Sequence, residues 1–138
     1  MANYYKIIDI EGVGSVYANK LHAAGIRSVD ALLKAGATPE GRKKLAEKTG
    51  IDQSLILKWV NMADLYRIKG IGSEYSELLE KAGVDTVKEL RNRLPENLVE
   101  KIREVNSSGR PIVRQIPGLK TVSNWIKQAK KLDPKIKY

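Results

Sequence analysis

Apolar residues recur at intervals of three and four along most of the chain, which is the spacing of one helix face. In residues 55–66 these positions are Leu55, Ile56, Trp59, Val60, Ala63 and Tyr66. The same spacing returns in residues 75–82, 98–105 and 122–129. No stretch alternates apolar and polar residues with a sustained period of two, as a half-buried strand would. The pattern therefore predicts an all-α protein.

Capping residues and glycines mark the expected helix boundaries. Thr38 precedes Pro39, which suits a cap followed by a first-turn proline, and Thr86 with Glu89 has the spacing of a capping box. Three glycines stand where helices should stop, at Gly25, Gly36 and Gly83. Ahead of Glu11, the residues NYYKIIDI are compatible with a short helix or with an extended segment.

An internal repeat organises the chain. Residues 10–33 align with residues 68–91 at ten identical positions, and both copies contain Gly-apolar-Gly-Ser. Trp59 and Trp125 end the two halves in equivalent places, and further turn-like segments precede them at 48–54 and 116–122. We therefore expect two tandem units, 1–66 and 67–138, which carry four turns in total and pack on one another.

The motif residues resemble a known family. IEGVGSVYANKL and IKGIGSEYSELL are similar to the helix-hairpin-helix motif, whose pattern places a small residue and then an apolar residue after the two glycines. The continuation resembles the paired helix-hairpin-helix domain at the N-terminus of archaeal and eukaryotic recombinases and in many repair enzymes. The whole chain also resembles a family of small prokaryotic proteins described only as a domain of unknown function. These resemblances imply two tandem paired helix-hairpin-helix units with four hairpins, and a contact with DNA.

The motif has a physical rationale of its own. Two glycines allow a tight reversal because they accept a positive φ, and they leave the backbone uncovered. The amides that follow lie at a helix start, where they have no internal partner and where the dipole is positive. Such a site can bind a phosphate while reading no base. The middle residues, Val13 and Ile71, should point inward between the helices.

Charge is concentrated in the last quarter of the sequence. The formal net charge is +9. Residues 67–138 hold sixteen Lys and Arg against nine Asp and Glu, and residues 105–138 hold eight basic residues against Asp133 alone. This asymmetry favours a polyanionic partner, nucleic acid before membrane, although a solvated basic tail would have the same composition.

The candidate phosphate-binding residues combine the turns with this basic region. Lys120 and Thr121 follow the fourth turn, so we expect that turn, helped by the second, to dominate. The predicted DNA-contacting residues are Gly12, Gly14, Ser15, Lys69, Gly70, Gly72, Ser73, Arg110, Arg114, Gly118, Lys120, Thr121, Lys127, Lys130 and Lys131. The predicted function is sequence-nonspecific binding of double-stranded DNA.

Three carboxylates oppose this interpretation. Glu11 precedes the first turn, Glu74 follows the second, and Asp52 lies at the third, where it would either repel phosphate or cap the next helix. Because a Gly-apolar-Gly turn can also be a plain helix connection, the alternative is a protein-interaction or scaffolding module that has the fold without DNA binding.

The aromatic residues support packing more than stacking on nucleic acid. Trp59 and Trp125 fall on apolar helix faces and should lie in the core. Tyr17 and Tyr75 occupy matching places, and the seam between the two units is one location for them.

Several other functions find no support in the residues. GVGSVY lacks the third glycine of a dinucleotide fingerprint, and His22, the only histidine, has no companions for a metal site. There is no Cys, which fits a reducing compartment. We expect no enzymatic activity, no cofactor, no metal, no small-molecule substrate and no membrane association. The expected location is the cytoplasm, with the nucleoid as its site if the protein binds DNA.

Overall fold

The computed structural model describes residues 5–138, and these residues form helices connected by turns, without a β-strand. The all-α class predicted from periodicity is confirmed. No helix in this part of the chain is both long enough and apolar enough to cross a bilayer. In chain order the elements are η1 (Ile7–Asp9, a 3-10 helix), α1 (Gly14–Ala23), α2 (Val29–Ala35), α3 (Pro39–Thr49), α4 (Gln53–Leu65), α5 (Ser73–Lys81), α6 (Val87–Leu90), α7 (Pro95–Ser107) and α8 (Leu119–Lys130).

Local chemistry explains the helix boundaries. The side chain of Thr38 accepts a hydrogen bond from the amide of Gly41 at 3.0 Å, and Pro39 opens α3, as expected. Thr86 likewise accepts from the amide of Glu89 at 3.2 Å. The Glu89 carboxylate pairs with Arg93 at 3.3 Å, so only the Thr86 half of the predicted capping box is formed. The sequence before Glu11 was compatible with a short helix or an extended segment, and the structure contains both. Lys6 makes an isolated bridge to Ser28, and η1 follows it.

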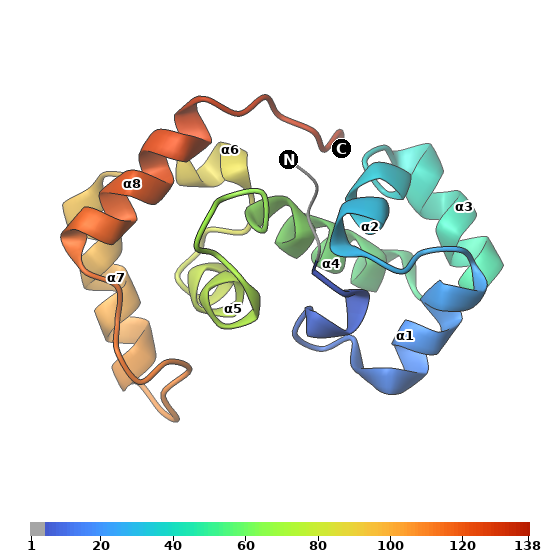
Figure 1. Cartoon of the computed structure of the whole chain (residues 1–138), viewed down its shortest axis with the longest axis horizontal. Coiled ribbons are helices and arrows are strands. Elements are labelled where there is room, and N and C mark those ends of the chain that lie inside the picture. Colours follow the sequence, from blue (N-terminus) through green and yellow to red (C-terminus); the bar gives the residue numbers. More distant parts are fainter. Residues whose placement is uncertain (1–4) are drawn as a thin grey trace.

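The helices divide into two groups, with α1 to α4 on one side and α5 to α8 on the other (Figure 1). Each group surrounds its own hydrophobic cluster, one drawn from residues 7–66 and the other from residues 65–129. Trp59 is buried in the first cluster and Trp125 in the second, so their predicted place in the core is confirmed. Helix α4 ends between the two groups and leads directly into the second one (Figure 1).

The two clusters repeat one aromatic arrangement. The rings of Tyr17 and Trp59 have centroids 5.1 Å apart, and the rings of Tyr75 and Trp125 are also 5.1 Å apart. Each tyrosine therefore packs against the tryptophan of its own group. The seam was one location considered for these tyrosines, and these contacts support the interior of each group instead.

The C-terminal tail, residues 131–138, returns from α8 to the first helix group (Figure 1). The amide of Lys137 donates to the carbonyl of Ala37 at 2.7 Å, and Arg42 Nη2 donates to the carbonyl of Lys137 at 2.8 Å. Ile136 packs against the first cluster, and the Tyr138 hydroxyl donates to Asn61 Oδ1 at 2.9 Å. The last residues of the sequence thus bind the half of the molecule in which the chain began.

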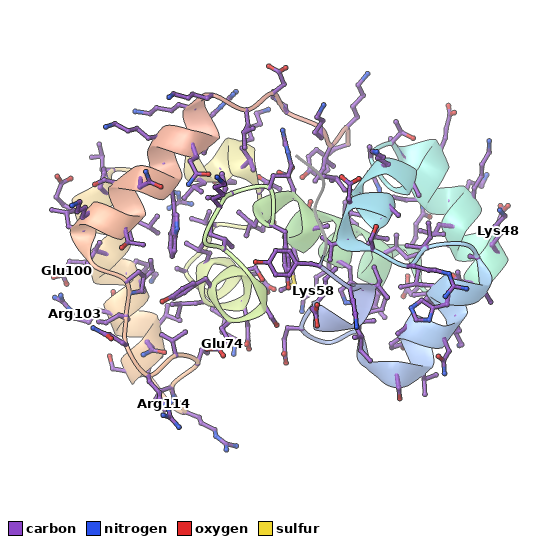
Figure 2. The ribbon with its side chains drawn as sticks, viewed as in Figure 1. Lys48, Lys58, Glu74, Glu100, Arg103 and Arg114 are labelled. Carbon is purple, nitrogen blue, oxygen red and sulfur yellow. The ribbon has the colours of Figure 1, made fainter. Side chains whose placement is uncertain are left out.

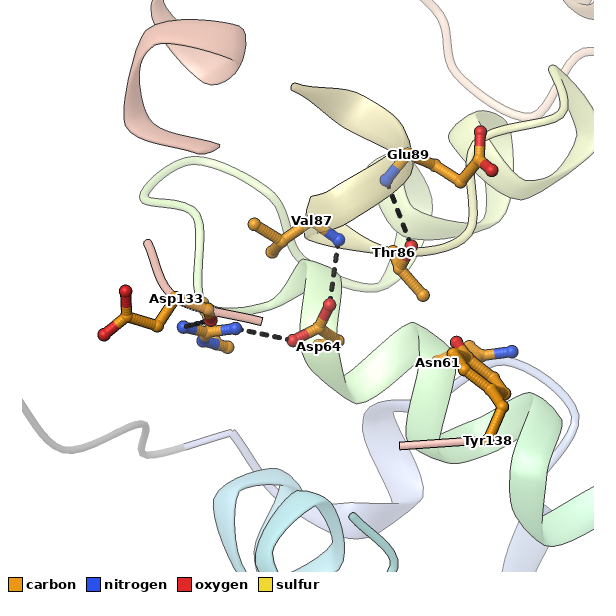
Figure 3. A network of polar contacts seen from close by, with 8 residues as sticks. Asn61, Asp64, Thr86, Val87, Glu89, Asp133 and Tyr138 are labelled. Carbon is orange, nitrogen blue, oxygen red and sulfur yellow. Dashed lines mark hydrogen bonds and ion pairs between the residues drawn. The ribbon is translucent and has the colours of Figure 1, made fainter. Parts of the chain in front are cut away.

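A buried carboxylate at the end of α4 connects three segments (Figure 3). Asp64 Oδ2 accepts the amide of Val87 at 2.8 Å, and Asp64 Oδ1 pairs with Arg67 Nη1 at 2.8 Å. Arg67 Nη2 donates in turn to the carbonyl of Asp133 at 2.8 Å. The network links α4 to the start of α6 and to the tail, and so helps to fix the second group relative to the tail.

Candidate nucleic-acid interface

Two equivalent turns precede α1 and α5, and we call them the α1 turn (residues 12–14) and the α5 turn (residues 70–72). Gly12 and Gly70 have φ values of +90° and +99°, which L-residues rarely adopt. A Cβ atom on Gly12 would lie 3.7 Å from Nε1 of Trp59, and one on Gly70 would lie 3.2 Å from Nε1 of Trp125. The backbone thus favours glycine at the first position of both turns, and at Gly70 the close indole adds a steric reason.

The apolar residue between the glycines is a core residue in both turns. Val13 and Ile71 are 1% and 0% exposed. Their predicted inward direction is confirmed. Gly14 and Ser15, which follow Val13, are exposed, whereas Gly72 and Ser73, which follow Ile71, are half-buried.

The second glycines differ between the repeats. Gly14 has a φ of +63°, whereas Gly72 is extended with a φ of −121°. Gly118, in the turn before α8 (the α8 turn, residues 117–118), has a φ of −79°. The left-handed backbone that the motif suggested is therefore absent at Gly72 and Gly118, where a side chain could be added without backbone strain.

The helix starts at α5 and α8 have no side-chain cap. Gly72 and Gly118 are the cap residues, and neither can provide an acceptor for the first-turn amides. Leu119, Lys120 and Thr121 in the first turn of α8 are all exposed. The first turn of α5 contains Glu74, whereas the first turn of α8 contains no acidic residue. By charge, α8 offers the more favourable start for a phosphate.

A depression of about 1120 Å³ lies between the start of α5 and the segment that leads into the α8 turn. Ser73 and Glu74 form one wall, and Arg103, Asn106 and Arg114 contribute to the other. In Figure 2, Arg103, Arg114 and Glu74 lie on the same side of the molecule, far from Lys48. The start of α5 and the segment that leads into the α8 turn therefore flank one hollow that two arginines border.

Asn106 shapes the loop that carries Arg110 and Arg114. Its Oδ1 accepts the amides of Ile112 and Val113 at 2.8 and 3.1 Å, and its Nδ2 donates to the carbonyl of Val113 at 3.0 Å. Side-chain amides satisfy a turning backbone in this way when no helix does. Arg110 and Arg114 remain exposed on this loop.

Gln128 holds the α5 turn against α8. Its Oε1 accepts the amide of Lys69 at 2.8 Å, and its Nε2 donates to the carbonyl of Lys69 at 3.2 Å and to Asn124 Oδ1 at 2.8 Å. Lys69 is thereby placed beside the basic helix. Sequence reasoning missed this residue, because a single glutamine on an exposed helix face gives no signal of a backbone contact.

A series of lysines lies on the exposed face of α8 and at its C-terminal end. Lys120, Lys127 and Lys131 recur at intervals of seven and four, so they follow one side of the helix, and Lys130 lies beside them. None of these four lysines has a carboxylate within ion-pair distance among the described residues. From Lys120 to Lys131 the positive charge extends over about 16 Å.

The predicted residues around the α1 turn lie among carboxylates, in contrast to the lysines of α8. Gly12 and Gly14 border a depression of about 620 Å³ together with Asp9, Glu11 and Ser73. Burial, followed by the charge of Glu11, raises the pKa of Glu77 on the neighbouring α5. Carboxylates therefore accumulate between the α1 turn and α5, where a phosphate would be repelled.

The start of α4 is capped by a carboxylate. Asp52 Oδ1 accepts the amide of Ser54 at 3.1 Å, which confirms the capping role considered for this residue. The predicted site residues thus fall into two sets. One surrounds the α5 and α8 turns, and the other, Gly12, Gly14 and Ser15, lies at the acidic α1 turn.

Comparison with known proteins places the sequence within one family model. The model of a domain of unknown function (DUF4332) matches residues 11–132. No curated protein matches the chain, and no solved structure matches it. Among residues 5–138, no group of His, Asp and Glu side chains is arranged to hold a metal ion.

Proposed function

The chain belongs to the DUF4332 family of domains of unknown function, and we propose that it binds double-stranded DNA without sequence preference. In this proposal the turns before α1, α4, α5 and α8 are helix-hairpin-helix hairpins arranged as two tandem paired units. The α5 and α8 turns supply backbone amides to phosphates, while Lys69 and the lysines of α8 supply charge. The protein acts by binding and catalyses no reaction.

The observation that carries the proposal is found in the second helix group, where α5 and α8 begin without a side-chain cap and the α8 lysines have no carboxylate partner among the described residues. Free amides at a helix start attract phosphate, and lysines without carboxylate partners keep their full charge for a ligand. Measured along the axis of the DNA helix, one strand has a phosphate about every 3.4 Å, so the lysine face of α8 can approach several of them. Amides and lysines read no base edge, which is why we expect no sequence preference.

The second helix group provides the DNA contact in this proposal, and the first group does not. Asp52 already occupies the start of α4, and Asp9 and Glu11 border the α1 turn. Gly12, Gly14 and Ser15 are therefore expected to shape the fold of the first group without contacting phosphate.

A second candidate function, protein interaction through the first group, has its own supporting observation. Ile8 and Val16 are 48% and 67% exposed beside the carboxylates of the α1 turn. Apolar side chains with an acidic border suit a basic protein segment better than they suit DNA. The two functions are compatible, because they use different groups of helices.

Fluorescence anisotropy with a short random-sequence duplex across a salt series tests the DNA proposal. We expect the affinity to fall steeply with salt, with a slope that corresponds to roughly four to eight neutralised phosphates. The double variant Lys120→Glu/Lys127→Glu should lose most of the affinity and reduce the slope by about two.

Lys43→Glu/Lys44→Glu is the matched control, because it changes the net charge equally on the exposed face of α3 in the first group. It should bind nearly as the wild type does. Adding side chains over the amides with Gly72→Val/Gly118→Val should also weaken binding. Neither position has a left-handed backbone, and a Cβ would meet nothing within 4 Å at Gly118 and the Tyr5 side chain at 3.4 Å or more at Gly72. Absence of binding at low salt, or equal losses in both charge variants, would reject hairpin-mediated DNA binding and leave the protein-interaction function.

A further inference from the structure

A groove of about 990 Å³ separates the first helix group from the second, and it shares only Lys69 and Gly70 with the DNA-binding surface proposed above. One wall comes from α2 and the short segment after it, with Leu33 and Ala37. The opposite wall comes from Ile68 and from Leu132 after α8, and Tyr66 belongs to the segment between the groups. The lining is mostly carbon, as in sites for small organic molecules.

The structure holds both walls in place without a ligand. The α5 turn is fixed to α8 by Gln128, and the beginning of the tail is fixed by Arg67, which donates to the carbonyl of Asp133 at 2.8 Å. The end of the tail is bound to the first group through the Lys137–Ala37 hydrogen bond at 2.7 Å. A groove with fixed walls loses little entropy when a ligand enters it.

The charged residues at the groove favour an anion. Asp30 is neutralised by Lys34 at 3.2 Å, and Arg67 is paired with Asp64 at 2.8 Å. Lys69 and Lys135 also line the groove, and neither has a carboxylate within ion-pair distance among residues 5–138. Two ammonium groups therefore remain for a ligand, and they match the charge of a phosphate monoester.

We propose that this groove binds a small organic phosphate with a planar apolar body, of the class of a nucleoside monophosphate. The phosphate contacts Lys69 and Lys135, and the planar body lies between the apolar walls, near Tyr66. The walls belong to different helix groups, so a bound ligand would connect the two groups directly. This inference does not rest on the DNA proposal.

Isothermal titration of the full chain at low salt, without DNA, tests the site. The probes are adenosine 5′-monophosphate (AMP), adenosine and ribose 5-phosphate. We expect AMP to bind saturably and each fragment to bind at least about tenfold more weakly, because each lacks one of the two recognised parts. Methyl chemical shifts of Leu33 and Leu132 should change with AMP.

Lys135→Glu should weaken AMP binding by at least about tenfold, since it removes a charge-assisted contact and adds repulsion. Lys137→Glu is the matched control, because the residue is exposed in the same tail but does not line the groove. It should change the affinity by less than about twofold. Both side chains are exposed, so both variants are expected to fold.

Three results would overturn the proposal. The first is the absence of saturable AMP binding at millimolar concentration. The second is equal binding of ribose 5-phosphate and AMP, which would remove the role of the apolar walls. The third is equal weakening by both lysine variants, which would mean a general attraction to a basic protein.

Discussion

Two charged side chains, Arg42 and Asp64, lie in the interior among the described residues, with exposed fractions of 5% and 3%. Each side chain forms a hydrogen bond with a backbone group that is distant from it in the sequence. Arg42 donates to the carbonyls of Gly36 and Lys137, both at 2.8 Å, and Asp64 accepts the amide of Val87. A buried charge without partners is costly, so these residues stabilise one arrangement of the segments that they join.

Asp64→Ala tests this role at the scale of one residue. The change leaves the Val87 amide and the Arg67 guanidinium without their acceptor, and we expect a loss of about 2–4 kcal/mol in the free energy of unfolding. Urea denaturation gives the value. Glu100→Ala is the control, because the Glu100–Arg103 pair at 3.1 Å is largely exposed and should contribute less than about 1 kcal/mol. Similar losses in the two variants would contradict a structural role for Asp64.

At the scale of elements, the two turns of the second group impose different requirements on their glycines. Gly70 has a positive φ and lies over the Trp125 indole, whereas Gly118 has an ordinary φ and open space around it. The same amino acid therefore has a packing role in one turn and leaves amides uncovered in the other.

Gly70→Ala and Gly118→Ala are a matched pair that separates these roles. Gly70→Ala should lower the free energy of unfolding by about 1–3 kcal/mol, because it combines backbone strain with a close approach to the indole. Gly118→Ala should change it by less than about 0.5 kcal/mol. Thermal unfolding followed by circular dichroism measures both. A stable Gly70→Ala variant would mean that the α5 turn can change its backbone.

The elements were predictable where a local pattern determines them. The threefold and fourfold spacing of apolar residues identified the helices, Thr38 was identified as a cap by its own side chain, and capping was one of two roles considered for Asp52. Arg42 was not predictable, because it stands among lysines and resembles a solvated face. It is buried because it lies three residues before the core residue Leu45 and because the tail covers it.

The same limit applies to the candidate site. The Gly-apolar-Gly pattern gave the inward direction of Val13 and Ile71, and composition located the basic region. Neither the pattern nor the composition could reveal the contact of Gln128 with Lys69, or the carboxylates near the α1 turn. Both features depend on which segments approach one another in the folded chain.

At the scale of the whole molecule, the tail is the part whose position no local sequence pattern predicted. Residues 131–138 contain a proline and several charges, and they show no helical periodicity. Their order comes from long-range contacts with Ala37, Arg42 and Asn61. The tail therefore couples the two helix groups, in addition to the direct connection through α4.

Ile136→Asp should weaken this coupling. Placing a carboxylate against the first cluster should lower the free energy of unfolding by about 1–2 kcal/mol and broaden the urea transition, because the groups then unfold less cooperatively. Lys137→Glu, with its exposed side chain, should leave the transition unchanged. An unchanged Ile136→Asp transition would show that α4 alone couples the groups.

The aromatic pairs described above make each half of the molecule optically distinct. The sequence contains two tryptophans, and each lies in a different hydrophobic cluster under its own tyrosine. In a Trp125→Phe variant the tryptophan emission comes only from the first half, and in a Trp59→Phe variant it comes only from the second. Intrinsic fluorescence can therefore follow the opening of either half, in the same chain and without an attached label.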